Sequence, residues 1–270
     1  MTMPVKLLVV GGGRMGAALI SGLLASEWAT PGDIAVVEPM ADSRALLSAA
    51  HPGLVVWERP EPDSVAPDGG AVLAVKPDIA ESACAALASA RPHRVLSVVA
   101  GLSTVRLEAA LPDDTVVVRA MPNTPVLVGA GISVISGGSR ADGADLDWAE
   151  DILSAVGTVV RLPEDLLDVV TGVSGSGPAY VFLVAEALIE AGVLGGLTPE
   201  DSRELVAGTL FGSAKLLVET GRSPEALRAD ITSPGGTTAA GLRTLEARQV
   251  RSAFLEAVAA ATERSRQLGH

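Results

Sequence analysis

A turn rich in glycine and hydroxyl side chains lies near the C-terminal end of the sequence. The stretch Ile231–Glu246 runs ITSPGGTTAAGLRTLE, with a Ser-Pro-Gly-Gly-Thr-Thr turn directly before an amphipathic segment. Backbone N–H groups at a helix N-terminus bind anions, because they lack partners within the helix and lie at the positive end of its dipole. Gly235 and Gly236 would let this backbone curl without Cβ clashes. The turn therefore predicts an anion cradle, and the alternative is that Ser233 or Thr237 only caps the helix.

A second glycine-rich turn lies near the N-terminus. The run Val9–Gly16 is a strand end, a glycine turn and a helix start, and its glycines fit the G-x-G-x-x-G spacing. In that motif the glycines allow a tight turn, a close approach to a pyrophosphate and close helix–strand packing. The pattern favours a dinucleotide site over a tight turn without a ligand. The residues that we expect to bind the cofactor here are Gly11, Gly13, Arg14, Met15 and Gly16.

The next predicted strand ends at Glu38. A carboxylate at this position accepts hydrogen bonds from an adenosine ribose and repels a 2′-phosphate, which favours NAD(H). Arg44 could pair with a 2′-phosphate and reverse that preference. Glu38 is equally consistent with a strand that ends in solvent, so the cofactor stays open between NADP(H) and NAD(H).

Two further loops follow later strands of the same half. Ligands of an open parallel sheet bind at the carboxyl ends of its strands, so both loops are expected beside the dinucleotide. Lys76 either brings charge to the pocket or is a surface lysine, and the small residues leave room for a flat nicotinamide. The residues that we expect to contact the cofactor are Ala74, Val75, Lys76, Pro77, Val99, Ala100 and Gly101.

Two more segments carry candidate side chains. In Arg119–Pro125, prolines frame Asn123, which is predicted either to contact the cofactor or to bond its own turn. Ser174–Tyr180 is predicted to be a second Gly/Ser turn that enters a helix, with Ser176 as a candidate cap. This turn either faces the nicotinamide or lets helices pack closely. Tyr180 is either a pocket hydroxyl or a structural side chain.

The two halves of the chain differ in pattern. The first alternates valine-rich runs with stretches of helical length, which predicts an α/β Rossmann-like domain with a parallel sheet over residues 1–162. The second has helix starts at Thr198 and Ser223, each followed by proline and an acidic residue, which predicts an all-α domain over residues 163–270. The predicted elements include strands Lys6–Val10, Ile34–Glu38, Ala71–Val75, Arg94–Val98, Thr115–Arg119 and Gly131–Ile135, and helices Met15–Ala25 and Ser43–Ala50.

Composition excludes several classes of function. The formal charge of −12 argues against nucleic acid or an anionic membrane as the main partner. Cys84 is the only cysteine and the three histidines are scattered, so we expect neither a disulfide nor a metal site. The N-terminal apolar run ends in glycines rather than a cleavage site, and long uncharged runs such as Ala120–Ser139 are broken by proline and glycine. We therefore expect a cytoplasmic protein without a membrane span.

Six ordered stretches resemble pyrroline-5-carboxylate reductases, over nearly the whole chain. They are GGGRMG (Gly11–Gly16), AVKP (Ala74–Pro77), SVVAGL (Ser97–Leu102), RAMPNTP (Arg119–Pro125), VSGSGPAY (Val173–Tyr180) and ITSPGGTTAAGLRTLE (Ile231–Glu246). The last is the most specific, since it matches the family's C-terminal signature from Pro224 through Glu246. The glycine loop is shared with many unrelated dehydrogenases and discriminates little.

The resemblance implies reduction of L-1-pyrroline-5-carboxylate to L-proline by NADPH or NADH, the last step of proline biosynthesis. It also implies a helical dimerisation domain, with homodimers often arranged in larger rings. The substrate is a cyclic imine with a carboxylate, so the C-terminal turn is expected to bind it through Ser233, Gly235, Gly236, Thr237 and Thr238. Thr238 is the expected catalytic residue, bonded to the ring nitrogen. Glu38 departs from the small polar residue typical of NADPH-preferring members.

Two rival hypotheses remain. One is a dehydrogenase for a β-hydroxyacid or another cyclic imine; the hydroxyacid enzymes need a lysine base, and Lys215 is the only lysine in the second half. The other is a cofactor-binding regulator without turnover, against which the intact turn at Ser233–Thr238 argues. Turnover of pyrroline-5-carboxylate would separate the three.

Overall fold

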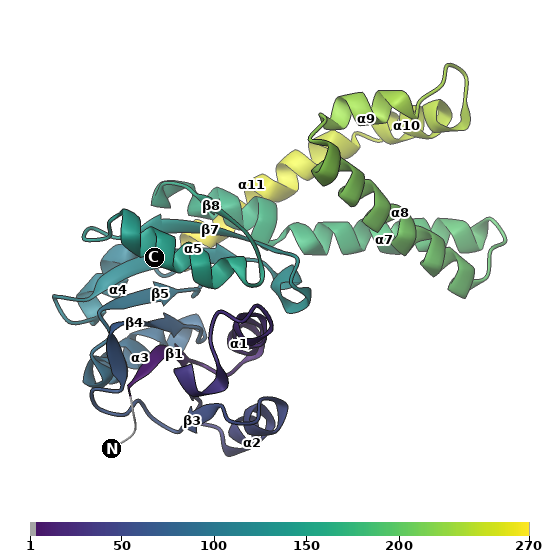
Figure 1. The fold of residues 1–270 in the computed structure, drawn as a ribbon. Helices are drawn as coiled ribbons and strands as arrows, with labels where there is room; N and C mark the ends of the chain where they lie inside the picture. The colour runs from purple at the N-terminus through teal and green to yellow at the C-terminus, as the bar shows by residue number, and fades with distance from the viewer. Residues whose placement is uncertain (1–3, 270) are drawn as a thin grey trace. The chain divides into compact units, whose positions relative to one another are not determined.

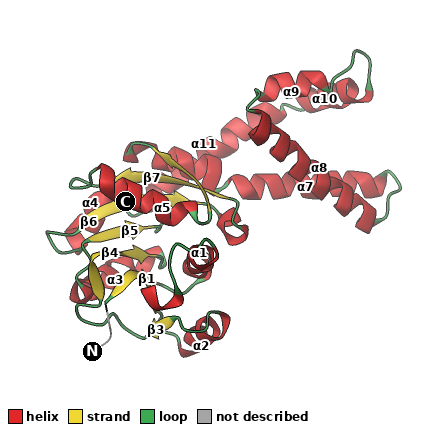
Figure 2. Cartoon of the chain, in the orientation of Figure 1, coloured by secondary structure: helices red, strands yellow, loops and turns green. Residues whose placement is uncertain are grey.

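The computed structural model describes residues 4–269, which form two compact units. The first comprises the chain up to Ser176 together with residues 260–270, and the second is Gly177–Ala259. All strands among the described residues lie in the first unit, and the second is helical (Figure 1, Figure 2). The predicted α/β and all-α fold class is confirmed.

The first unit is built on one eight-stranded sheet with the order β3-β2-β1-β4-β5-β6-β7-β8. All neighbours are parallel except β6 and β7, which are antiparallel. The strands are β1 (Val5–Val10), β2 (Ile34–Val37), β3 (Val55–Trp57), β4 (Val65–Leu73), β5 (Arg94–Ser97), β6 (Val116–Pro122), β7 (Gly131–Gly137) and β8 (Gly157–Arg161).

Helices cover both faces of this sheet. Alternate residues of β1 serve the two cores: Leu7 and Val9 pack in one cluster, and Leu8 and Val10 in the other. The first cluster takes its helical residues from α1 (Arg14–Ala25), α2 (Ala41–Ala50) and α5 (Gly143–Ser154). The second takes them from α3 (Ala80–Leu87) and α4 (Thr104–Ala110). Both faces are therefore buried, which explains why the central strands are continuous apolar runs.

The predicted strands and helices of this half are confirmed to within a few residues, except at β4. Two strands, β3 and β8, were not predicted. β4 begins six residues before the predicted Ala71, and its register with β1 shifts between Val5 and Leu7. β3 has only three residues, all of them half-buried, and β8 is largely exposed. The apolar run of β3 is too short to identify a strand, and glycine, threonine and arginine interrupt the apolar pattern of β8.

The second unit contains α7 (Gly177–Leu194), α8 (Pro199–Thr220), α9 (Pro224–Asp230), α10 (Thr237–Ala247) and the first part of α11 (Val250–Gly269). The two predicted helix caps are confirmed. Thr198 Oγ1 accepts a hydrogen bond from Asp201 N at 3.1 Å, and Ser223 Oγ accepts one from Ala226 N at 3.3 Å.

Within Gly177–Ala259 no apolar side chain is buried in the single chain. Ser202 is the one described residue of this unit that is buried. Large apolar side chains such as Leu194, 88% exposed, and Phe211, 72% exposed, face outward instead. A helical unit without a core cannot offset its conformational entropy alone. Its apolar surface therefore requires a further partner.

The division after Ser176 lies later than the boundary predicted after residue 162. Contacts explain the difference. Glu164 bonds to Thr104 and Arg119, and Asp168 Oδ1 accepts a 2.6 Å hydrogen bond from Ser265 Oγ, which holds the first helical turns of the second half against the sheet domain. The same contact brings the end of α11 into the first unit.

The segment Ser174–Tyr180 is not the turn that its glycines and serines predicted. A π-helical turn, Thr171–Gly175, joins α6 (Leu167–Val170) to α7, and Ser176 N donates to Thr171 O at 2.8 Å. The helical run consequently extends from Glu164 to Leu194 and, by length and composition only, could cross a membrane, contrary to the expectation that no segment would.

Candidate functional site

The glycine loop joins β1 to α1 at the carboxyl end of the sheet. Gly11 has φ +105°, and a Cβ there would lie 2.5 Å from Ala74 O. A Cβ on Gly16 would overlap Gly11 O, whereas one on Gly13 would meet nothing within 4 Å. Gly13 is the N-cap of α1 and makes no side-chain cap bond, and the space beside its Cα is open. The loop thus has the close packing and the open anion-binding end that a dinucleotide requires.

A cavity of about 810 Å³ opens beside this loop. Among the expected cofactor residues it is lined by Gly11, Gly13, Glu38, Ala74, Val75 and Lys76. Sequence analysis missed other lining residues on the loops after β2, β3 and β4, among them Met40, Glu58, Arg59 and Ile79. Expected residues outside the lining are Arg14, Met15, Gly16, Pro77, Val99, Ala100, Gly101 and Asn123.

Glu38 is folded against the glycine loop. Its Oε2 accepts a hydrogen bond from Gly12 N at 3.1 Å, its Oε1 accepts one from Met40 N at 2.9 Å, and the residue is only 9% exposed. The alternative of a strand end in solvent is therefore wrong. A Cβ on Gly12 would overlap the Leu47 side chain and lie 3.2 Å from Glu38 Oε2, so glycine at this position is what allows the contact.

Two residues of the loop after β5 make structural contacts within the protein. Val99 is 2% exposed, and its N donates to Ser97 Oγ at 3.3 Å. Gly101 has φ +74°, and a Cβ there would lie 3.3 Å from Leu268 O near the end of α11. Their role in cofactor binding stays a prediction, as does that of the exposed Ala100 between them.

Asn123 bridges the loop after β6 to the π-helical turn. Its Nδ2 donates to Ser174 O at 3.2 Å, and its Oδ1 accepts from Ile132 N at 2.9 Å. The side chain therefore fixes its surroundings rather than its own turn, and a cofactor contact remains a prediction. π-Helical turns occur frequently at functional sites, which makes this bridge a candidate positioning device.

A partly buried ion pair that sequence analysis missed holds the same region. Arg119 Nη1 donates to Glu164 Oε1 at 2.9 Å, and Thr104 N and Oγ1 donate to the two carboxylate oxygens at 2.7 and 2.5 Å. Burial raises the pKa of Glu164, but the hydrogen bonds from Thr104 and the Arg119 guanidinium outweigh it, and the net pKa is lowered. The carboxylate is therefore ionised and lies at the N-terminus of α4.

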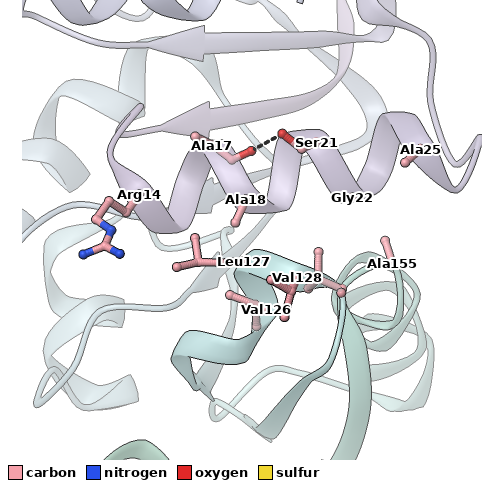
Figure 3. Close-up of a pocket in the computed structure, with 12 residues that line it drawn as sticks. Arg14, Ala17, Ala18, Ser21, Gly22, Ala25, Val126, Leu127, Val128 and Ala155 are labelled. Atoms are coloured by element: carbon pink, nitrogen blue, oxygen red, sulfur yellow. Dashed lines mark hydrogen bonds between the residues drawn. The ribbon is translucent and has the colours of Figure 1, made fainter. Parts of the chain in front are cut away.

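A separate groove of about 540 Å³ lies between α1 and the loop around the 3₁₀ helix η4 (Thr124–Val128). Figure 3 shows Leu127 and Val128 facing the small residues of α1, with Arg14 at one end. The Ser21 hydroxyl in this groove donates to Ala17 O at 2.9 Å. Arg14 therefore borders the apolar groove and is absent from the lining of the dinucleotide cavity.

The C-terminal turn lies in the second unit. Gly235 has φ +71°, Gly236 is the N-cap of α10, and Gly236 N donates to Ser233 O at 3.0 Å. No side chain caps α10, so the alternative that Ser233 or Thr237 serves as the cap is wrong. The N-cap of α10 therefore gives the first N–H groups no side-chain acceptor, which is the arrangement that binds a carboxylate. Thr238 follows, half-buried.

Metal-ligand groups of three or more His, Cys, Asp or Glu side chains do not occur within residues 4–269. Cys84 is buried in the core, and burial raises the pKa of its thiol to about 11. The thiol is therefore protonated at neutral pH and is not a nucleophile.

Comparisons with known proteins give a consistent family. A family model described as pyrroline-5-carboxylate reductase dimerisation matches residues 164–268, and one described as NADP oxidoreductase, coenzyme F420-dependent, matches residues 6–101. The pyrroline-5-carboxylate reductase of Synechocystis sp. is 42% identical, over 99% of both chains. The chain belongs to the pyrroline-5-carboxylate reductase family. The Escherichia coli reductase is 35% identical over 97% of this chain and 98% of its own.

Solved reductase structures share the fold over the full length. The Coxiella burnetii pyrroline-5-carboxylate reductase superposes with a TM-score of 0.91 at 33% identity, covering 98% of this chain and 99% of that chain. The Plasmodium falciparum pyrroline carboxylate reductase, solved with NADP bound, gives 0.84 at 31% identity and covers both chains fully. The open N-terminus of α1 and the space around Gly13 fit such a dinucleotide.

Family membership also explains the coreless second unit. The dimerisation model spans Gly177–Ala259 entirely and includes the apolar run Glu164–Leu194. The dimerisation domain supports homo-oligomerisation, and burial of the exposed apolar side chains of this unit against another copy of the chain is consistent with it.

Proposed function

We propose that this protein reduces L-1-pyrroline-5-carboxylate to L-proline with NADPH or NADH, as the last step of proline biosynthesis. The observation that carries the proposal is the uncapped turn before α10, within a chain 42% identical to a reductase of that name over its full length. A turn of this kind suits a substrate that carries a carboxylate.

Each part of the turn has a role in the proposal. The N–H group of Thr237 and the hydroxyl of Ser233 hold the carboxylate, Gly236 leaves room for that hydroxyl, and Gly235 supplies the left-handed backbone that aims them. Thr238 Oγ1 bonds to the ring nitrogen. A reduced nicotinamide, when bound, would supply the hydride: a new C–H bond would form at the imine carbon, and the C=N π electrons would pass to nitrogen. The nitrogen carries a proton from solvent, so the product is a secondary amine and the oxidised cofactor. Catalysis by this chain is then chiefly positioning.

We further infer a homodimer, which can assemble into a ring of dimers, in the cytoplasm, with no nucleic acid or membrane as partner. We place the functional boundary after residue 162, because the dimerisation model begins at residue 164. The dimer is supported by the apolar faces of the second unit and by the family description.

The rival hydroxyacid hypothesis gains no support. Lys215, the lysine that it would need as a base, lies exposed on α8, and its Nζ pairs with Glu219 Oε1 at 3.6 Å in an ordinary i,i+4 ion pair. A lysine base is instead typically buried, which lowers its pKa toward neutrality.

Substitution of Thr238 tests the proposal. Proline formation from pyrroline-5-carboxylate is followed by mass spectrometry and by loss of reduced-nicotinamide absorbance. We expect Thr238→Ala to lose at least about tenfold in kcat/KM, since one preorganised hydrogen bond at a reacting centre contributes that much or more. Thr244→Ala is the matched control, because that hydroxyl on the same helix already donates to Ala240 O at 3.3 Å. Absence of proline formation by the folded wild type would overturn the proposal.

A further inference from the structure

The adenosine end of the dinucleotide cavity carries a fixed carboxylate. Glu38 follows β2 directly, lines the cavity and is held by two backbone N–H groups, those of Gly12 and Met40. A side chain fixed on both oxygens cannot swing away from a ligand without leaving two N–H groups unpaired. The Glu38 charge is therefore a permanent part of the cavity wall.

The nearest arginine is engaged elsewhere. Arg44 Nη1 donates to Glu38 O at 2.9 Å and to Pro39 O at 2.6 Å, and its Nη2 lies 3.7 Å from Glu58 Oε2. A guanidinium that satisfies two carbonyls and a carboxylate is poorly placed to receive a 2′-phosphate, which answers the question that the sequence left open about Arg44.

The remaining charges of this end are mixed. Glu58 lines the same cavity, and so does Arg59, an exposed arginine that follows it in the chain. Lys76 also lines the cavity, on the loop after β4, and Arg59 is the arginine of the lining that could pair with a 2′-phosphate. Arg59 is an exposed side chain in contact with solvent, whereas Glu38 is buried and held by two hydrogen bonds, so the carboxylate dominates at the ribose.

We propose that Glu38 is the specificity-determining residue of the cofactor site and makes NADH the preferred cofactor of this chain. Its free lone pairs accept hydrogen bonds from the ribose hydroxyls of NADH, and its charge repels the 2′-phosphate of NADPH. The relative from Plasmodium falciparum has NADP bound in its structure, so this chain would differ from it in cofactor choice. The inference rests on the proposed function, because it names the preferred cofactor of that reaction. Nucleotide binding alone is enough to test it.

Direct binding tests the proposal without turnover. Dissociation constants of NADH and NADPH are measured by nicotinamide fluorescence for the wild type and for Glu38→Gln, which removes the charge and keeps an oxygen acceptor. We expect the wild type to bind NADH at least about tenfold more tightly than NADPH, and Glu38→Gln to lose most of that ratio, chiefly by tighter NADPH binding. Glu38→Ser, which opens the ribose site, should move the ratio further.

Two control variants make the test specific. Asp78→Asn removes an exposed carboxylate from the lining of the same cavity and leaves the glycine loop and the Arg44 contacts intact, so its NADH/NADPH ratio should stay near that of the wild type. Arg59→Gln should weaken NADPH at most slightly. Equal or tighter binding of NADPH by the wild type would overturn the proposal. An NADH/NADPH ratio that changes in Arg59→Gln but not in Glu38→Gln would also overturn it. A protein that binds NADH tightly but makes no proline would refute the proposed function and leave this inference standing.

Discussion

Loss of the Glu164 carboxylate should loosen the contact between the sheet domain and the start of the long helical run. Breaking a buried ion pair by removing one partner costs about 3–5 kcal/mol, because the other charge is left uncompensated. Arg119 is 11% exposed in its side chain but Glu164 is 27% exposed, so solvent screens part of this pair. We therefore expect Glu164→Ala to lower the free energy of unfolding by about 2 kcal/mol and Glu164→Gln by about 1 kcal/mol.

Tryptophan fluorescence in a urea titration is the assay. All three tryptophans, Trp28, Trp57 and Trp148, lie in the first unit, so the signal reports that unit. Protein concentration is held constant, since oligomers gain stability by mass action. Asp165→Asn is the matched control, because this neighbouring acid is exposed. Equal stability of Glu164→Ala and Asp165→Asn would refute the reasoning.

The same pair predicts a pH dependence. The folded-state pKa of Glu164 lies below its ordinary value of 4.5, so its stabilisation is present above pH 4.5 and is lost as the pH falls through the lower folded pKa. The stability difference between the wild type and Glu164→Gln should be full at pH 7 and should shrink below about pH 4.5. A difference that is unchanged down to pH 3 would contradict this assignment.

Three further predictions follow from the glycine loop, the helical unit and the π-helical turn. Gly16→Ala should unfold at lower temperature and lose nucleotide binding, because its Cβ would overlap a carbonyl of the same loop. Gly13→Ala should fold normally and weaken only nucleotide binding, because its Cβ would meet no other atom within 4 Å. Calorimetry measures the unfolding temperature, and titration measures nucleotide binding. Phe211→Glu should shift the protein toward monomers in light scattering, since it charges an apolar side chain on α8 that is 72% exposed in the single chain. Asn123→Ala should lower kcat more than it raises KM for pyrroline-5-carboxylate, because it frees the π-helical turn without removing a substrate ligand; an unchanged kcat would refute a positioning role.

The sequence predicted those elements whose signal is local. Continuous valine runs identified the central parallel strands, the glycine spacing identified the loop before α1, and proline with an acidic residue after Thr198 and Ser223 identified two helix starts. These features depend on a few neighbouring residues. Short or exposed strands such as β3 and β8 lack such a signal and were missed.

Features that depend on distant partners were not predictable. Ser174–Tyr180 has the composition of a turn, yet it continues a helix, and its Ser174 carbonyl accepts a hydrogen bond from Asn123, about fifty residues earlier. Glu164 has no sequence signal that points to Thr104, sixty residues away. At the C-terminal turn the glycines were recognised, but the absence of a side-chain cap on α10 emerged only from the backbone geometry.

Hydride transfer to the imine carbon is the central claim, and an isotope label tests it most directly. The purified protein is given pyrroline-5-carboxylate and NADH or NADPH carrying deuterium at both C4 positions of the nicotinamide, and the product is analysed by mass spectrometry and NMR. The account predicts proline heavier by one deuterium, located at C5, the former imine carbon. Proline without deuterium at C5, or no proline from a folded and nucleotide-binding sample, would contradict it.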